Sequence, residues 1–159
     1  MLVRDAARQA AEETLRTYWD GTYPVDPFEI ARRMGLTVKV TALRPDISGA
    51  IVAEGRDDVT ILVDPGDNYG RMAFTCAHEL GHFKEREAKD DPEYSFVELR
   101  SGGRYDLHEF YADEFAGNLL MPEEPFRREI RMHGSDRLTA ATFAVTPAAV
   151  RKRRQRLGI

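Results

Sequence analysis

The sequence has one cysteine and one tryptophan, and it lacks long apolar runs. A single cysteine, Cys76, excludes an internal disulfide, which agrees with a reducing compartment. Nowhere do about 18 apolar residues follow one another, and the first residues lack the apolar core of a secretory signal. We therefore expect a cytoplasmic protein without a membrane partner. The 159 residues, 42% of them hydrophobic and 31% charged, suit one domain with a buried core.

The net charge of −4 is unevenly distributed along the chain. Residues 127–159 hold nine Arg and Lys against two acids, a net charge of +7, which leaves −11 for residues 1–126. This asymmetry indicates that the C-terminal segment meets something acidic: nucleic acid, a partner surface or the rest of the chain. A solvated helix face is the simpler interpretation. We expect a domain over residues 1–126 and a basic helical segment over 127–159 packed on it.

Hydrophobic periodicity and capping residues predict an α+β fold in which helices pack on a small antiparallel sheet. Asp26, Pro27 and Gly35 mark the start and end of one short helix especially clearly. Residues 85–106 are charged and contain Pro92, Gly102 and Gly103, so we expect a long loop there. The predicted helices cover residues 2–19, 27–34, 70–84, 107–120 and 123–132, and the predicted strands cover 36–41, 47–53 and 59–63.

The motif that says most about the function of the protein consists of His78, Glu79 and His82. Two histidines four positions apart differ by about 40° around a helix of 3.6 residues per turn, so both imidazoles can point at one atom. This geometry, with a glutamate beside it, is typical of a zinc ion that activates water next to a general base. Cys76 is about 200° around the helix from His78 and is expected in the core.

A catalytic zinc usually has three protein ligands, so this motif lacks one. A metzincin would have glycine and histidine where Glu85 and Ala88 stand, which excludes that subclass. Glu109 is the favoured third ligand, because Asp113 follows one turn later and can accept the second N–H of a ligand imidazole. A closed structural zinc is disfavoured because such sites take four Cys or His ligands. The alternatives to Glu109 are His108, its main competitor, Glu98 and Glu114.

An ordered set of motifs covers residues 71–82, 109–116 and 119–122, with residues 24–31 and 47–49 upstream. This set resembles the ImmA/IrrE family of bacterial zinc metallopeptidases. The resemblance implies zinc ligands at His78, His82 and Glu109 and a catalytic base at Glu79. It also implies a protein substrate, a bacterial or phage helix-turn-helix repressor. Asp113 stands where many members have asparagine, but either side chain can accept the imidazole hydrogen bond.

The expected reaction is hydrolysis of a peptide bond, in which Glu79 takes a proton from the attacking water and passes it to the leaving amine. The developing oxyanion needs a donor besides the zinc. The sequence does not choose among the candidates, and each also fits a packing or surface role. These candidates are Tyr105, His108, Tyr111 and His133.

Residues 137–157 predict two short helices joined by a tight turn, with Thr146 as N-cap and Pro147 at the first helical position. This helix-turn-helix outline offers an alternative function, a DNA-binding regulator that uses Arg151, Arg153 and Arg154. Two helices of this size bury little apolar surface alone. We therefore favour packing on the peptidase domain through Phe143, Val145, Val150 and Leu157.

Overall fold

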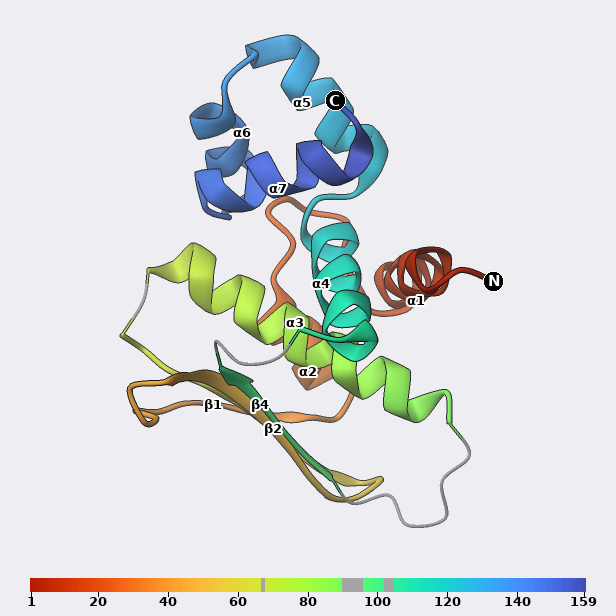
Figure 1. Ribbon diagram of the computed structural model, residues 1–159, viewed down its shortest axis with the longest axis vertical. Coiled ribbons are helices and arrows are strands. Elements are labelled where there is room, and N and C mark those ends of the chain that lie inside the picture. Colours follow the sequence, from red (N-terminus) through yellow and green to blue (C-terminus); the bar gives the residue numbers. More distant parts are fainter. Residues whose placement is uncertain (67, 90–95, 102–104) are drawn as a thin grey trace.

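The computed structural model describes residues 1–66, 68–89, 96–101 and 105–159. These residues form helices on one face of a four-stranded sheet, which confirms the α+β class (Figure 1). None of the described helices is both long and apolar enough to cross a membrane. The helices are α1 (Val3–Tyr18), α2 (Pro27–Arg33), α3 (Tyr69–Glu87), α4 (Leu107–Leu120), α5 (Glu123–His133), α6 (Asp136–Phe143) and α7 (Pro147–Leu157). The strands are β1 (Thr37–Val40), β2 (Ile47–Gly55), β3 (Asp58–Val63) and β4 (Phe96–Ser101).

The sheet is mixed, so the expectation of a purely antiparallel sheet is wrong at one edge. The strand order is β1-β3-β2-β4, and β2 runs antiparallel to both of its neighbours. The first three strands alternate in direction, but β3 lies between β1 and β2 and pairs with β1 in parallel. Because the hairpin pairs β2 and β3 with each other, β1 pairs with the other edge of β3.

The long loop expected over residues 85–106 is wrong in two places. Helix α3 continues to Glu87, and residues 96–101 form β4 on the edge of β2. Residues 90–95 and 102–104 of this expected loop lie outside the described residues. The strand was missed because its pairing with β2 is a long-range contact, whereas the charges around it are the local signal for a loop.

The capping residues act as predicted. Asp26 accepts hydrogen bonds from the backbone N–H groups of Phe28 and Glu29, and Pro27 opens α2. Thr146 accepts from the N–H of Ala149, and Pro147 opens α7. Each side-chain oxygen satisfies backbone donors that the first helical turn leaves without intrahelical partners. The local sequence therefore fixes where these helices begin.

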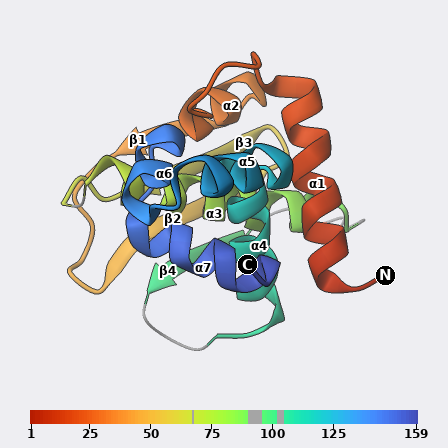
Figure 2. The same cartoon turned by 90° about the horizontal axis from the view of Figure 1, so that it is seen from above.

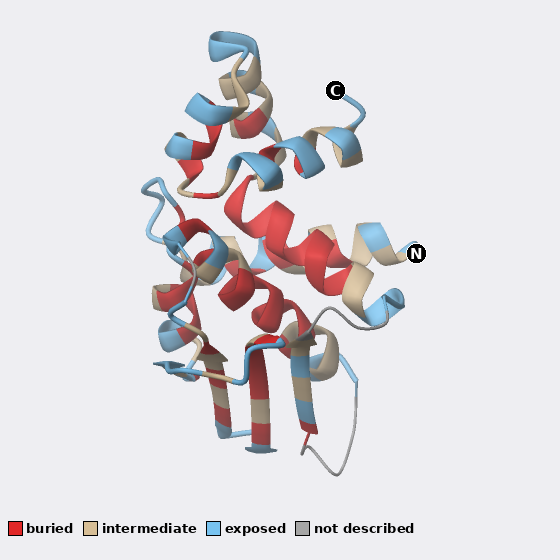
Figure 3. Ribbon diagram, turned by 60° about the vertical axis from the view of Figure 1, so that its left-hand side comes forward, coloured by how far each residue is buried: buried red, intermediate tan, exposed pale blue. Residues whose placement is uncertain are grey.

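Helix α3 lies at the centre of the fold, between the sheet and α4, and α1 packs on α4 (Figures 1 and 2). Buried residues gather on these central helices (Figure 3). Gly81 allows the close approach of α3 to α4, because a Cβ atom there would lie 2.8 Å from the Cα of Ala112. This contact places the N-terminal half of α4 against the histidines of α3.

Candidate metal centre

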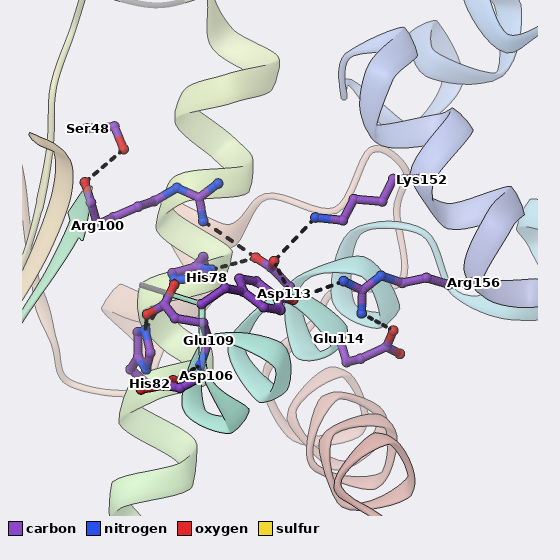
Figure 4. Close-up of polar contacts among 11 residues, drawn as sticks. Ser48, His78, His82, Arg100, Asp106, Glu109, Asp113, Glu114, Lys152 and Arg156 are labelled. Atoms are coloured by element: carbon purple, nitrogen blue, oxygen red, sulfur yellow. Dashed lines mark hydrogen bonds and ion pairs between the residues drawn. The ribbon is translucent and has the colours of Figure 1, made fainter. Parts of the chain in front are cut away.

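Three side chains from two helices converge between α3 and α4 (Figure 4). His78 and His82 are buried on α3, and Glu109 comes from the first turn of α4. The Nε2 atoms of the two histidines are 3.1 Å apart. The Glu109 carboxylate lies 3.2 Å from Nε2 of His78 and 3.0 Å from Nε2 of His82. Among the residues that the structure describes, no other cluster of this kind is present.

The donor set and its spacing fit a zinc ion. Bonds of about 2.0–2.1 Å to a tetrahedral zinc place neighbouring ligand atoms about 3.3 Å apart. The two Nε2 atoms are 3.1 Å apart, close to that value, while the distances of 3.2 and 3.0 Å run from His78 and His82 to different oxygens of Glu109. One ligand atom from each of the three residues lies within 4.8 Å of the others. Two imidazoles and a carboxylate are also the ligand chemistry of catalytic zinc sites with one open position. The trio can therefore hold a metal ion.

Asp113 orients His78 from the side opposite Glu109. Its Oδ1 accepts a hydrogen bond of 2.8 Å from Nδ1 of His78. An ionised carboxylate can only accept, so Nδ1 carries the proton and Nε2 can present its lone pair to a metal. Burial raises the pKa of Asp113, but the His78 hydrogen bond and the nearby Lys152 and Arg100 outweigh it and hold this pKa well below its usual range. Asp113 therefore stays ionised.

The two histidines differ in their affinity for protons. Burial lowers the pKa of His78, but its hydrogen bonds with Asp113 and Glu109 outweigh burial and raise this pKa overall. Burial and the neighbouring His78 lower the pKa of His82. The hydrogen bond with His78 lowers the pKa of Glu109 against the effect of burial. The centre thus favours a positive charge between His78 and Glu109, whether a proton or a metal supplies it.

Glu79 is fully buried, and neither carboxylate oxygen has a hydrogen-bond partner among the described residues. Burial raises the pKa of Glu79 to about 8, against the lowering effect of His78 and Arg100. A buried carboxylate without partners is costly, so it indicates a functional role. Gly49 on β2 leaves space beside it, since a Cβ atom there would lie 3.5 Å from Oε1 of Glu79 and would clash with Thr75.

The alternatives to Glu109 point to other partners. Nδ1 of His108 lies 2.7 Å from Glu85 at the surface. Glu98 forms an ion pair with Arg86 at 3.1 Å. Glu114 is buried but bonds to Arg156 of α7. Of the four candidates, Glu109 is the one that lies with both histidines.

The family model of the IrrE N-terminal-like domain matches residues 49–154 of the chain. This range is more than half of the chain and includes the whole cluster. The chain belongs to this peptidase family. The resemblance seen in the sequence is thereby confirmed, and the family supports a metallopeptidase type of function. No curated protein gives a significant match to the chain.

In this IrrE N-terminal-like domain, three donors that the sequence did not reveal surround Asp113 together with His78. Tyr105 donates from its hydroxyl at 3.1 Å, and Lys152 of α7 lies 3.3 Å away. Arg100 of β4 lies 3.6 Å from the same carboxylate. Only tertiary packing assembles these groups, because they come from separate segments.

The four candidate oxyanion donors lie in different places. The Tyr105 hydroxyl binds Asp113 and accepts from Arg156, and Tyr111 is buried on α4. His133 is on α5, 3.0 Å from Glu129, while His108 pairs with Glu85. Tyr105 is thus the candidate whose polar group is connected to the metal cluster through a hydrogen bond.

The basic residues of α7 face in different directions. Arg153 is buried and donates to the carbonyl of Met121 and the side chain of Asn118. Arg154 forms an ion pair with Asp136, and Arg151 is exposed. Helices α6 and α7 are joined by a tight turn in which Ala144 has a φ of +52°. Val145 and Val150 are buried.

Proposed function

We propose that this IrrE N-terminal-like domain is a zinc-dependent endopeptidase of the cytoplasm. The observation that carries the proposal is the convergence of two Nε2 atoms and a carboxylate, next to a buried glutamate without hydrogen-bond partners. His78, His82 and Glu109 would hold the zinc. When bound, zinc supplies Lewis-acid chemistry, which makes water a nucleophile at neutral pH and polarises a carbonyl.

Glu79 acts as the general base in this proposal. Its carboxylate accepts a proton from the attacking water and passes that proton to the leaving amine. Burial raises the pKa of Glu79, which makes its carboxylate a stronger proton acceptor for the first step. Asp113 keeps the His78 ring in place, and the packed α3–α4 interface excludes bulk water from the inner side of the centre.

The substrate in this proposal is a helix-turn-helix repressor of a bacterium or phage. The family resemblance supports this assignment. The alternative, a DNA-binding regulator, has weaker support, because Arg153 bonds within the protein and Arg154 is paired with Asp136. A protein that recognises DNA bases needs side chains that are free to reach into a groove of the DNA. Arg151 is exposed and remains available for such a contact.

The deciding experiment is incubation of the zinc-loaded protein with candidate repressors, followed by mass spectrometry of any fragments. The matched control is Glu79→Gln, which should still bind about one zinc per chain but lose cleavage by about a thousandfold. Cleavage by the wild type at one defined bond supports the proposal. Fragments at equal rates from both proteins contradict the role of Glu79, and no fragments from any repressor contradict the substrate class. DNA binding that falls steeply with salt and requires Arg151 would favour the alternative.

A further inference from the structure

A cavity of about 230 Å³ lies beside the metal centre, where α3, α4, β4 and α7 meet. Thr75 and Asp113 form part of its wall. Thr75 precedes Glu79 by about one turn of α3, and Asp113 contacts His78. A substrate side chain that enters this cavity therefore belongs to a residue within a few positions of the peptide bond held against Glu79.

The wall of the cavity carries an excess of positive charge. Its two carboxylates are already engaged, since Asp113 contacts His78 and Lys152, and Glu114 contacts Arg156 (Figure 4). The wall therefore has a net charge of +3 when its cations and carboxylates are counted together. The five cations are Arg71, Arg100, Lys152, Arg153 and Arg156.

Arg153 is the one buried residue among these five cations. Its side chain is only 4% exposed, and it donates to the carbonyl of Met121 and to Oδ1 of Asn118, each at 3.1 Å. Both acceptors are neutral. A buried guanidinium is normally paired with an anion, because desolvation of an unpaired charge is costly. Burial lowers the pKa of Arg153 to about 10, although Glu114 and Glu123 act in the opposite direction.

The rest of the wall is mixed, with apolar side chains from Phe74, Met121 and Ala149 and hydroxyl groups from Ser48, Thr75 and Thr146. A ligand that suits this wall carries one anionic group on a short aliphatic stem, which is the chemistry of a glutamate or aspartate side chain. We propose that the cavity is a subsite that receives an acidic side chain of the substrate. This inference rests on the proposed peptidase function, because only a bound polypeptide brings such a side chain next to Glu79.

Binding of a small probe tests the subsite without cleavage. The full chain, labelled with ¹⁵N, is titrated with N-acetyl-glutamate amide and with N-acetyl-glutamine amide. We expect the glutamate probe to shift the backbone amides of Thr75, Gly117 and Ala149, with a Kd on the order of 1 mM. The glutamine probe should bind about tenfold more weakly, since it lacks the charge. Equal binding of both probes, or no binding of the glutamate probe, overturns the proposal.

Ala148 provides a matched pair of variants, because it is exposed and lies on the cavity wall in the first turn of α7. Ala148→Glu places a resident carboxylate among the cations, whereas Ala148→Gln adds the same bulk without charge. We expect Ala148→Glu to lose binding of the glutamate probe by about tenfold relative to Ala148→Gln. Circular dichroism checks that both variants fold. Equal affinities of the two variants contradict the proposed electrostatic recognition.

Cleavage of a mixed peptide library separates this inference from the proposed function. The wild type should cut peptides enriched about tenfold in Asp or Glu at one fixed position from the scissile bond, and Ala148→Glu should lose that enrichment. Cleavage without acidic enrichment overturns the proposed subsite but does not contradict the proposed peptidase function. Absence of any cleavage contradicts the peptidase, and the probe titration then decides the cavity alone. Inorganic phosphate that displaces the glutamate probe at equal concentration would assign a free-anion site and overturn the peptide subsite.

Discussion

Lys152 of α7 lies 3.3 Å from Oδ2 of Asp113, the residue whose Oδ1 accepts the Nδ1 proton of His78 at 2.8 Å (Figure 4). The C-terminal helix is thus connected to a candidate metal ligand through one carboxylate. The Lys152 side chain is half exposed, so it contributes mainly by holding Asp113 ionised and oriented rather than by strong stabilisation of the fold.

Lys152→Met should weaken zinc binding by a few fold, because Asp113 loses one of the groups that orient it. Asp113→Ala should have the larger effect, about 10- to 100-fold, because it removes the hydrogen bond to His78 itself. Competition with a chromogenic chelator measures both affinities. Arg151→Met is the matched control, since it removes a charge from an exposed neighbour on the same helix. An equal loss in Arg151→Met would mean that net charge, not orientation, is responsible, and Lys152→Arg should restore affinity.

Gly81→Ala should destabilise the protein by about 1–3 kcal/mol, although alanine is the better helix former. The added methyl group would lie 2.8 Å from the Cα of Ala112 and would push α4 away from α3. Urea denaturation measures the change, and zinc affinity should fall with it because Glu109 is on α4. Gly117→Ala is the control, as its methyl group would meet only the Arg153 side chain at 3.7 Å. That variant should gain up to about 1 kcal/mol; similar losses in both variants would refute the close-approach argument.

Arg156→Met should cost about 3 kcal/mol of unfolding free energy, because it leaves the buried Glu114 carboxylate without its cation. Arg154→Met is the control on the same helix. It breaks the more exposed pair with Asp136 and should cost about 0–1 kcal/mol.

The Arg156 experiment also tests how the basic segment relates to the rest of the chain. We propose that residues 127–159 and residues 1–126 unfold as one unit, and a single urea transition in the wild type is the expected result. Two separate transitions, or equal costs for the two arginine variants, would contradict this proposal.

Asp64→Asn should lower the melting temperature at pH 7 by on the order of a few degrees. The Asp64 carboxylate accepts from the backbone N–H groups of Leu43, at 2.8 Å, and Gly66, at 2.7 Å, and these bonds lower its pKa below 3.8. A pKa that is lower in the folded state stabilises the fold fully above the unfolded pKa, and this contribution is lost as pH falls through the folded value. The difference between the two proteins should therefore shrink below about pH 4.

Thermal melts at a series of pH values measure this dependence. Asp57→Asn, in the exposed turn between β2 and β3, is the control and should change the melting temperature little at any pH. A difference between Asp64→Asn and the wild type that stays constant down to pH 2 would rule out the charge of Asp64 as its cause.

Local patterns in the sequence are sufficient to predict the helices and the part of the candidate site that lies on α3. The four-residue spacing of His78 and His82 requires a helix if both are to face one atom, and Asp26 and Thr146 cap the helices that they were expected to cap. The spacing of Glu109 and Asp113 placed both on one face of a later helix. That reasoning left His108 open, because neighbours in sequence on a helix differ by about 100° and the facing side depends on the packing.

Long-range contacts were beyond the reach of these patterns. The sequence predicts a loop where β4 lies, because the partner strand β2 is about 45 residues away and nothing local encodes that pairing. The position of β3 between β1 and β2 also depends on strand pairing that no local pattern encodes. Arg100 and Lys152 meet at Asp113 only because the fold brings β4 and α7 near enough for their long side chains to reach α4.

The sequence by itself determined which functional groups are present and on which helices: two imidazoles and a glutamate on one helix, a carboxylate on another, and the caps that begin these helices. The tertiary structure alone decided that Glu109 meets the histidines, that Asp113 gathers cations from distant segments, and that a positively charged cavity opens beside Glu79. The physical reason is that helix periodicity and capping act within a few residues, whereas the distance between side chains on different elements depends on how closely their backbones pack. At Gly81, the absence of a single methyl group sets that distance.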